Sequence, residues 1–426
     1  MFLIKKENLK ILLFLIPISF IIGIAVTEFF VLLSIIFFIF LNKDQSILKD
    51  SKIIFLLLFS FYIFLNSYFQ ITDRSKDLLL SSLFHFRFVI FSLSIFCFCK
   101  IFENSKENIF FLLFIFSLFV LLFDSIFQFF NGANLLGYKI LSGRVSSFFE
   151  DELILGSFLV RILPIIFWFI FFLRFDLKKN FFYFVFFFSL YFISIYLSGE
   201  RTSFFLSSIL ILTIFFVIKR LRRILSYSIL IFILFALSTS YYKIGNADLV
   251  DRMFVKTFNQ MTDNKIVAKK NDNINFENIS KNFKIYSSDH EGHLKLAFKL
   301  FNENKIFGIG PRGFRYHCRG INYDSDEGVC STHPHNILIQ IVSELGLIGL
   351  SFYIFAGIFV LFNFFQLILK KEYEDDYLSF YSITFGLIIN LFPFIPGGDF
   401  FNNWISIILY YNIGFYLYSY KKCVRK

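Results

Sequence analysis

Twelve stretches of this sequence are long and apolar enough to cross a lipid bilayer as α-helices. Such a helix needs about 20 mostly apolar residues to span roughly 30 Å of hydrocarbon, because lipid offers the backbone no hydrogen-bond partner. Of the 426 residues, 57% are hydrophobic and only 17% are charged, which excludes an ordinary soluble domain. We therefore predict an all-α fold, a polytopic transmembrane helical bundle of about 12 spans. The predicted spans are residues 9–26, 28–41, 53–70, 78–99, 109–130, 153–173, 180–198, 203–218, 224–241, 337–369, 378–395 and 403–420.

The short loops predict which way the bundle faces, because cytoplasmic loops carry an excess of lysine and arginine. The N-terminus, alternate loops and the C-terminus hold 21 of these residues, whereas the opposite short loops hold five: Arg74, Lys76, Lys139, Arg144 and Arg201. Both termini are therefore predicted in the cytoplasm, and the first segment is predicted to be an uncleaved anchor because no small-residue cleavage site follows it. This distribution explains much of the net charge of +11, so no nucleic-acid partner is predicted.

One long polar stretch, residues 242–336, separates the first nine predicted spans (1–241) from the last three (337–426). By the same charge count this large loop lies on the outer side, and loops of this length usually have a function. Residues 259–284 are predicted to be flexible. Residues 290–304 repeat apolar side chains at helical spacing, which predicts a short amphipathic helix on the membrane surface or over a cavity.

Five of the six histidines lie in the long loop, namely His290, His293, His317, His333 and His335. The last of them almost directly precedes the predicted tenth span, where an imidazole meets both water and lipid headgroups. Histidine changes its charge near neutral pH and is the most frequent general base in enzymes. The histidines are therefore candidate site residues, while solvated loop histidines without a function remain the alternative.

The start of the tenth span carries a polar stripe formed by Asn336, Gln340 and Glu344. A spacing of four residues places these three side chains on one face of a helix. A carboxylate inside a membrane segment is costly and commonly functional. Glu344 is therefore a further candidate, and the alternative is that it pairs with an arginine and stabilises the bundle.

Arginines on the outer side are candidate ligands for an anionic group, because the planar guanidinium binds phosphate through two parallel hydrogen bonds. Arg201 follows Ser198-Gly199-Glu200 in a tight outer turn. Its structural alternative is a side chain that merely extends to the membrane surface. Arg144, Arg312 and Arg315 are further outer-side candidates.

Two arginines, Arg87 and Arg161, lie inside predicted spans, where a charged side chain needs a polar partner or cavity. His85 and Asp124 are available as companions for them. Structural pairing and substrate contact are both open for these two arginines.

Two cysteines of the long loop, Cys318 and Cys330, flank an acidic stretch on the oxidising side of the membrane, where disulfides persist. A disulfide between them would hold the His333–Asn336 segment against the rest of the loop. Zinc is the rival explanation because histidines are nearby, but the Cys-x-x-Cys spacing typical of zinc sites is absent. We predict the disulfide and no metal.

Three motifs follow one another in the second half of the chain. They are Ser198-Gly199-Glu200-Arg201-Thr202, the Gly308-Ile309-Gly310 turn that leads to Phe314-Arg315, and His333-Pro334-His335-Asn336 with Gln340, Glu344, Gly346, Gly349 and Leu350. Together with the many spans and the single large outer loop late in the sequence, they resemble the O-antigen ligase and O-antigen polymerase superfamily of bacterial envelope glycosyltransferases.

The resemblance implies an enzyme of the bacterial inner membrane that moves a glycan from a polyprenyl diphosphate carrier to an acceptor hydroxyl on the periplasmic face, with no metal or other cofactor. His335 would be the general base, oriented by Asn336 or Glu344, and Arg201 would stabilise the departing diphosphate together with Arg312 or Arg315. The expected catalytic residues are His335, Arg201, His333 and Glu344, and the expected substrate-binding residues are Arg312, Arg315, Asn336, His293, His290, Arg144 and Arg87. The expected partners are the lipid-linked glycan, the bilayer and other polysaccharide-assembly proteins.

The sequence before the Gly-x-Gly turn favours one branch of this superfamily. Many ligases carry an arginine and a tryptophan there, where this chain has Asp289-His290-Glu291-Gly292-His293. We therefore favour a polymerase of polysaccharide repeat units, with a ligase that transfers the finished chain to lipid A-core as the alternative. A flippase or other transporter of lipid-linked glycans is the alternative from another class, although the polar groups gather on one outer face and not along a central path.

Overall fold

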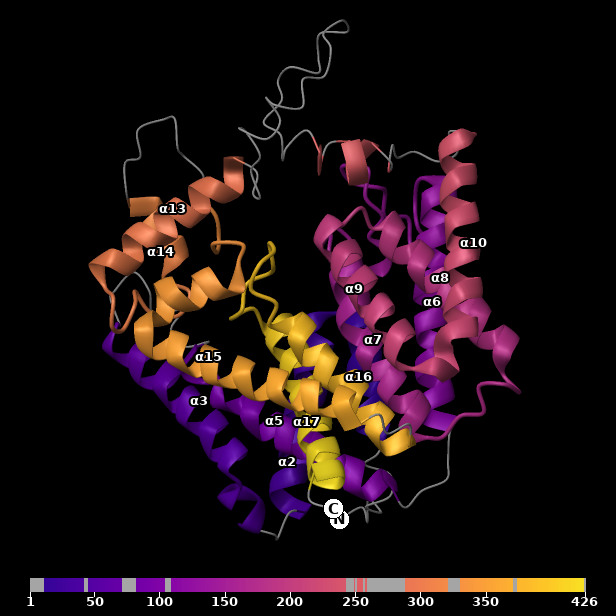
Figure 1. Cartoon of the computed structure of the whole chain (residues 1–426). Coiled ribbons are helices and arrows are strands. Elements are labelled where there is room, and N and C mark those ends of the chain that lie inside the picture. The colour runs from indigo at the N-terminus through magenta and orange to yellow at the C-terminus, as the bar shows by residue number, and fades with distance from the viewer. Residues whose placement is uncertain are drawn as a thin grey trace, which may run out of the picture.

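The computed structural model describes residues 11–41, 45–70, 82–103, 109–242, 249, 251–255, 257–258, 288–320, 330–370 and 374–424. These residues are almost entirely helical, and extended pairing among them is limited to two isolated β-bridges in the loop after residue 131. One helix lies over each of the twelve predicted segments (Figure 1): α1 (Leu12–Ile22), α2 (Ile24–Leu41), α3 (Ser51–Phe69), α5 (Phe86–Glu103), α6 (Ile109–Asn131), α7 (Leu155–Phe172), α8 (Phe181–Leu197), α9 (Arg201–Val217), α10 (Arg222–Tyr241), α15 (Ile337–Lys370), α16 (Asp375–Asn390) and α17 (Asn403–Val424). The all-α prediction is confirmed for the described residues.

Five helical segments are long and apolar enough to cross a membrane by length and composition, namely α3, α6, α7, residues 219–241 and α15. Four shorter helices, α1, most of α2, α8 and α9, are also apolar. The chain is therefore a multi-pass membrane protein. The outer surface of the helices is apolar, as a protein in lipid requires. Side chains such as Phe182 and Phe216 are largely exposed there and would contact lipid.

The most buried of the long helices is α7, which lies among α8, α9 and α16 near the middle of the bundle. Close packing against α16 depends on Gly386, because a Cβ atom there would come within 2.8 Å of the Pro164 side chain. On another face, the Trp168 indole donates a hydrogen bond of 2.8 Å to the Ser419 hydroxyl of α17. Small residues and interhelical hydrogen bonds of this kind are what hold helices together in lipid.

The long loop contributes two short helices above the start of α15: α13 (Ser288–Glu303) and α14 (Phe314–Gly320) (Figure 1). The first confirms the predicted amphipathic helix and begins two residues earlier than expected. The second was not predicted. The two helices share a small apolar core that is separate from that of the bundle: Leu296, Ala297, Leu300, Ile309, Phe314 and Cys318. The predicted flexible stretch, residues 259–284, lies outside the described residues.

Helix α15 is broken at Gly346, whose backbone has φ 64° and ψ −161°. The turn before α14 fills the break: the Ile309 amide donates to the Ser343 carbonyl at 3.0 Å and the Gly310 amide to the Glu344 carbonyl at 2.9 Å. The Leu347 amide in turn donates to the Lys305 carbonyl at 2.9 Å. Backbone groups freed by a kink at membrane depth must find such partners, because lipid supplies none.

Side chains of α3 satisfy carbonyls on both sides of this contact. The Tyr62 hydroxyl donates to the Leu345 carbonyl at 2.6 Å, and the Asn66 amide donates to the Phe307 carbonyl at 2.6 Å. The Gln70 amide, just past the helix end, donates to the Gly308 carbonyl at 3.0 Å. Helix α3 therefore fixes the position of the 305–310 turn relative to α15.

We predict that Gly346→Ala destabilises the protein, because alanine tolerates a left-handed φ poorly and its Cβ would clash with the Ile306 backbone. The conformational strain alone costs about 1–3 kcal/mol. Gly357→Ala in the same helix is the matched control, since a Cβ there meets nothing within 4 Å. Thermal unfolding of the purified variants in detergent should show a clear loss for Gly346→Ala and no loss for Gly357→Ala. Equal midpoints for the two variants would contradict the proposed role of the break.

Candidate active site

Four histidines meet where α13 lies against the segment that leads into α15. His290 and His293 come from α13, and His333 and His335 come from residues 331–336. The ring of His335 lies 4.1 Å from that of His333, 5.1 Å from that of His293 and 5.4 Å from that of His290, measured between centroids. His317, the fifth loop histidine, is exposed and makes none of these ring contacts.

The segment that carries His333 and His335 is held by the loop between α16 and α17. The Gly397 amide donates to the His335 carbonyl at 2.7 Å, and His335 itself adopts a left-handed φ of 55°. Asn336 begins α15: its side-chain oxygen accepts from the Ile339 amide at 3.0 Å, as an N-cap residue does. The other end of the Asn336 side chain donates to the Pro393 carbonyl at 2.8 Å. Asn336 thus positions the neighbouring histidine through the backbone.

Hydrogen bonds define which nitrogen of His333 carries the proton, and one further contact involves the His335 ring. His333 Nε2 lies 3.3 Å from the Gly397 carbonyl, which can only accept, so this nitrogen carries the proton in the neutral ring. His333 Nδ1 then accepts from the Thr332 hydroxyl at 3.0 Å. The His335 Nε2 atom lies 2.9 Å from the Ser331 hydroxyl.

Burial and the neighbouring charges keep the imidazoles of His333 and His335 uncharged at neutral pH. Burial, and to a lesser extent the neighbouring His333, His290 and His293, together lower the pKa of His335 to about 3. Burial also lowers the pKa of His333, against the attraction of Asp399. A neutral imidazole can accept a proton, and an anionic ligand placed beside it would make that proton transfer more favourable.

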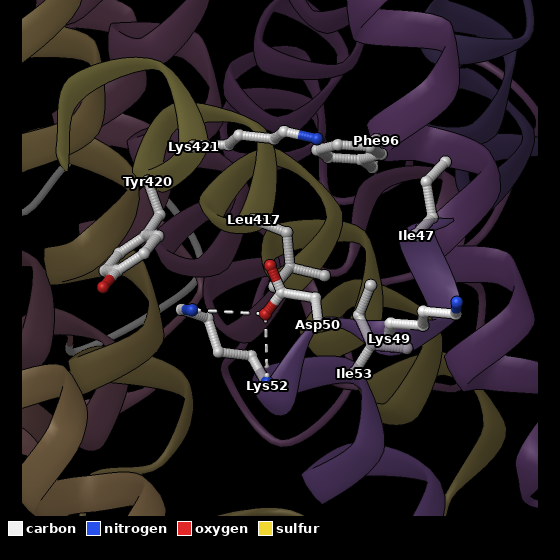
Figure 2. Close-up of a pocket in the computed structure, with 9 residues that line it drawn as sticks. All are labelled: Ile47, Lys49, Asp50, Lys52, Ile53, Phe96, Leu417, Tyr420 and Lys421. Carbon is white, nitrogen blue, oxygen red and sulfur yellow. Dashed lines mark hydrogen bonds and ion pairs between the residues drawn. The ribbon is translucent and has the colours of Figure 1, made fainter. Parts of the chain in front are cut away.

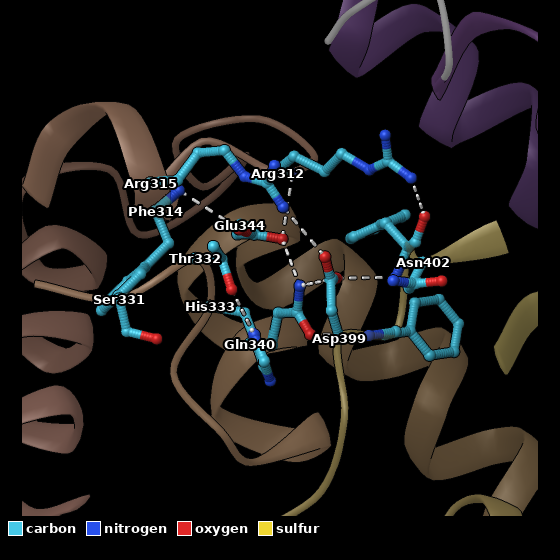
Figure 3. Close-up of polar contacts among 12 residues, drawn as sticks. Arg312, Phe314, Arg315, Ser331, Thr332, His333, Gln340, Glu344, Asp399 and Asn402 are labelled. Atoms are coloured by element: carbon cyan, nitrogen blue, oxygen red, sulfur yellow. Dashed lines mark hydrogen bonds and ion pairs between the residues drawn. The ribbon is translucent and has the colours of Figure 1, made fainter. Parts of the chain in front are cut away.

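Glu344 is fully buried and lies between Arg312 and Gln340 (Figure 3). It accepts hydrogen bonds from the Arg312 amide at 3.0 Å and from the Phe314 amide at 3.1 Å. The Gln340 side-chain amide donates to the same carboxylate at 3.0 Å, so the predicted one-face arrangement of Gln340 and Glu344 is confirmed. The carboxylate thereby fixes the turn from which the Arg312 and Arg315 side chains extend.

Asp399 is a central site residue that sequence reasoning missed. It accepts from the Gln340 amide at 2.7 Å and from the Phe401 backbone amide at 2.9 Å, and it forms an ion pair of 3.2 Å with Arg315 (Figure 3). The signal for it was present but weak: one acidic residue, after Gly397-Gly398, in a short loop between two predicted spans. Gln340 joins the two buried carboxylates into one network.

Three guanidinium groups approach the start of α17. Arg315 is bound to Asp399, Arg312 donates to the Phe401 carbonyl, and Arg87 from α5 donates to the Asn403 side chain at 3.3 Å. Burial lowers the pKa of Arg312; the carboxylates of Asp399 and Glu344 oppose this shift, whereas the positive charges of Arg315 and Arg87 add to it. Guanidinium groups gathered in this way can donate several hydrogen bonds to an anionic ligand, although Asp399 and Glu28 already pair with two of them.

The expected companions of Arg87 were partly wrong. Its ion pair is with Glu28 of α2 at 3.1 Å. Asp124 does not serve it, because that carboxylate accepts from the Leu135 amide and from the Ser147 hydroxyl, within the loop that follows α6. His85 lies close enough to Arg87 for their charges to interact.

The remaining predicted cations, Arg144 and Arg201, lie in a second cluster around Glu200 at the start of α9. Glu200 accepts from the Gly156 amide at 2.9 Å and forms an ion pair of 3.5 Å with Arg144. Arg252 donates to the Gly199 carbonyl at 3.1 Å, and burial lowers the pKa of Arg144, opposed by Glu200. Figure 1 shows α9 and α13 on different sides of the molecule.

Arg161 connects the two clusters through the start of α17. Its side chain is 4% exposed, donates to the Ser157 carbonyl at 3.0 Å, and lies over the Trp404 ring at 5.7 Å. Trp404 directly follows Asn403, which Arg87 contacts. The first residues of α17 therefore contact cations from both clusters.

A disulfide joins Cys318 of α14 to Cys330, whose Cα atoms are 5.3 Å apart. It connects the helix that begins next to Arg312 with the segment that carries the histidines. The described residues contain no group of three or more His, Cys, Asp or Glu side chains placed to hold a metal ion.

These features define a class: a multi-pass, all-α membrane protein with a polar site of imidazole, guanidinium and carboxylate groups around one helix break. Residues 184–354 match the family model described as O-antigen ligase. Over these residues, which are less than half of the chain, the predicted resemblance is confirmed as an O-antigen ligase domain. The match includes the four clustered histidines, Glu200, Arg312, Arg315 and Glu344, whereas Arg87 and Asp399 lie outside it. No curated protein matches the chain.

We predict three free and two bonded cysteines in the native protein. The chain has five cysteines, of which Cys97, Cys99 and Cys423 are free. Alkylation of the denatured, unreduced protein should therefore add three groups by mass spectrometry, and alkylation after reduction should add five. The double variant Cys318→Ser/Cys330→Ser should take up three under both conditions. Five groups without reduction would contradict the disulfide.

We also predict that the histidine cluster makes stability depend on pH. The pKa of His335 in the folded protein, about 3, lies below its ordinary value of about 6.5, so the unfolded chain binds more protons between these values. Stability is then present above about pH 6.5 and decreases as the pH falls toward 3. His335→Asn, which suits the left-handed backbone, should lose less thermal stability than wild type between pH 7.5 and 5. His317→Asn is the control and should behave as wild type; identical pH dependence in all three proteins would contradict this account.

Proposed function

We propose that this protein is a membrane glycosyltransferase that moves a glycan from a polyprenyl diphosphate carrier to an acceptor sugar hydroxyl, and that it polymerises polysaccharide repeat units. The observation that carries the proposal is the meeting of imidazoles with half-buried guanidinium groups within and beside an O-antigen ligase domain. The imidazoles supply a base for the acceptor, and the guanidinium groups supply a binding site for a diphosphate leaving group.

The proposal places all twelve apolar helices across the bacterial inner membrane, with both termini in the cytoplasm and the histidines on the periplasmic side. The excess of basic residues in one set of loops supports this orientation. A carrier lipid in the outer leaflet would then reach the site from the membrane, with its diphosphate at the level of the broken helix.

In the proposed reaction, the acceptor hydroxyl oxygen attacks the anomeric carbon of the donor sugar. A new glycosidic C–O bond forms, and the bond between that carbon and the diphosphate oxygen breaks with its electron pair on the diphosphate. His335 accepts the proton of the hydroxyl. Arg312 and Arg315 stabilise the negative charge that develops on the leaving group, and Arg87 adds to the local positive charge.

The other polar residues position these groups. Asn336 holds the histidine segment, while Glu344 and Asp399 hold the turn and the side chain of Arg315. His333, His290 and His293 surround His335 and keep its ring neutral until the anion arrives. We propose that Arg201 contacts the carrier from the α9 side, and that Arg144 supports its turn.

The histidines of α13 support polymerase activity over ligase activity. His290 and His293 lie in the stretch where many ligases carry an arginine and a tryptophan, and both rings contact His335. A ligase that transfers the chain to lipid A-core remains the alternative. Transport of the lipid-linked glycan has less support, because the candidate site lies at one end of the helices.

We predict that His335→Asn abolishes chain extension in a strain that lacks the chromosomal copy, because the acceptor loses its base. Membrane insertion and protein level should not change. His317→Asn, which alters an exposed histidine of the same loop, should restore long polysaccharide on a gel as wild type does. Long polysaccharide from His335→Asn would contradict the proposed mechanism.

The same strain separates the alternatives. Core lipid that carries a single repeat unit indicates a polymerase, bare core indicates a ligase, and an untranslocated lipid-linked glycan that accumulates inside the cell indicates a transporter.

A further inference from the structure

A cavity of about 250 Å³ lies at the end of the bundle remote from the histidines (Figure 2). It is formed where α3 begins, where α17 ends, and by Phe96 of α5. Helix α3 gives the distance between this cavity and the candidate active site. Lys52 of α3 lines the cavity, whereas Asn66 of the same helix contacts the 305–310 turn. The rise of a helix places these two residues about 20 Å apart. The cavity is therefore a second site.

The lining of the cavity has two parts. Its floor is apolar, made by Ile47, Ile53, Phe96 and Leu417, each of which is buried. Its remaining lining residues are Lys49, Asp50, Lys52, Tyr420 and Lys421, so the lining carries three lysines and one aspartate. An apolar floor beneath a net positive rim is complementary to a molecule with an anionic head and an apolar body.

Neighbouring groups hold two of the three lysines at the cavity. Lys52 Nζ lies 3.2 Å from the Asp50 carboxylate and 4.2 Å from the centre of the Tyr420 ring. Lys421 Nζ lies 5.7 Å from the centre of the Phe96 ring. Asp50 also accepts from the Lys52 amide at 3.1 Å and so begins α3. The site is thus built from fixed side chains on two transmembrane helices.

We propose that this cavity binds the phosphodiester headgroup of an anionic glycerophospholipid. The lysines bind the phosphate as point charges, and the apolar floor contacts the glycerol and the first methylenes of the acyl chains. The inference rests on the membrane orientation given above, which places the cavity at the cytoplasmic leaflet, and not on the glycosyl transfer reaction. Soluble phosphate compounds share the headgroup chemistry, and the test separates them from the lipid.

The test uses the full-length protein in neutral detergent, titrated with phosphatidylglycerol or phosphatidylcholine and read by native mass spectrometry. Wild type should bind phosphatidylglycerol more tightly than phosphatidylcholine. A lysine near a membrane contributes about fivefold in affinity, so Lys49→Gln/Lys421→Gln should weaken phosphatidylglycerol binding about 25-fold. This double variant leaves the Asp50–Lys52 pair intact. Lys421→Arg should retain the affinity.

The control is Lys178→Gln/Lys179→Gln, which removes two exposed lysines from the α7–α8 loop on the same side of the bundle. It should bind phosphatidylglycerol within about twofold of wild type. Equal affinity of wild type for the two lipids, or equal weakening by the control variant, would overturn the proposal. Thermal stabilisation by glycerol 3-phosphate that equals the effect of phosphatidylglycerol would assign the cavity to a soluble phosphate instead.

This test is independent of the proposed reaction. The Lys49→Gln/Lys421→Gln variant should still restore long polysaccharide in the deletion strain. A failure of the His335→Asn prediction would leave the lipid measurement intact, and loss of lipid selectivity would leave the glycosyl transfer proposal intact.

Discussion

The contact between two glycine backbones, Gly308 and Gly346, is the constraint on which the site depends. A helix that breaks inside a membrane exposes amide and carbonyl groups that lipid cannot satisfy, so another segment must reach the break. The 305–310 turn does so, and both glycines lack the Cβ that would keep the two backbones apart. One consequence concerns Glu344, which lies just before the break. Its buried carboxylate can accept from the amides of residues 312 and 314 only because the turn lies directly on α15.

A second feature of the site is that hydrogen bonds to backbone groups fix its side chains, in addition to the ion pairs between them. Asp399 is bound by an amide side chain and a backbone amide as well as by Arg315, and His335 is fixed by a backbone contact to Gly397. Ionic groups in a low-dielectric environment gain from such hydrogen bonds, since an ion pair alone seldom offsets its desolvation. The arrangement brings guanidinium groups and uncharged imidazoles into one site, as the proposed anionic leaving group would require.

Much of the helical framework could be predicted from sequence, because apolar runs and helical periodicity are local signals. The twelve segments and the amphipathic helix over residues 290–304 follow from such signals, whereas the break at Gly346 was not predicted. The start of α5 was placed too early, since Phe84 and His85 precede the helix in a turn. Helix α14 has seven residues and depends on its apolar contacts and on the disulfide, so its own sequence carries little signal. Arg87 pairs with Glu28, and Asp399 pairs with Arg315; both pairs join residues far apart in the chain. Such contacts cannot be predicted from the spacing of residues in the sequence.

The loop between α16 and α17 receives contacts from Arg312, from Arg315 and from the histidine segment. The first residues of α17 receive contacts from α5 and α7. Both parts lie beyond residue 354, where the O-antigen ligase domain match ends. The unit defined by family similarity is therefore smaller than the unit that assembles the site. A chimera that exchanged only residues 184–354 with a relative would combine the histidines of one protein with the α16–α17 loop of the other. It would also place a foreign Gln340 position against the Asp399 of this chain. A chimera between two such proteins should therefore exchange the last two helices together with the domain.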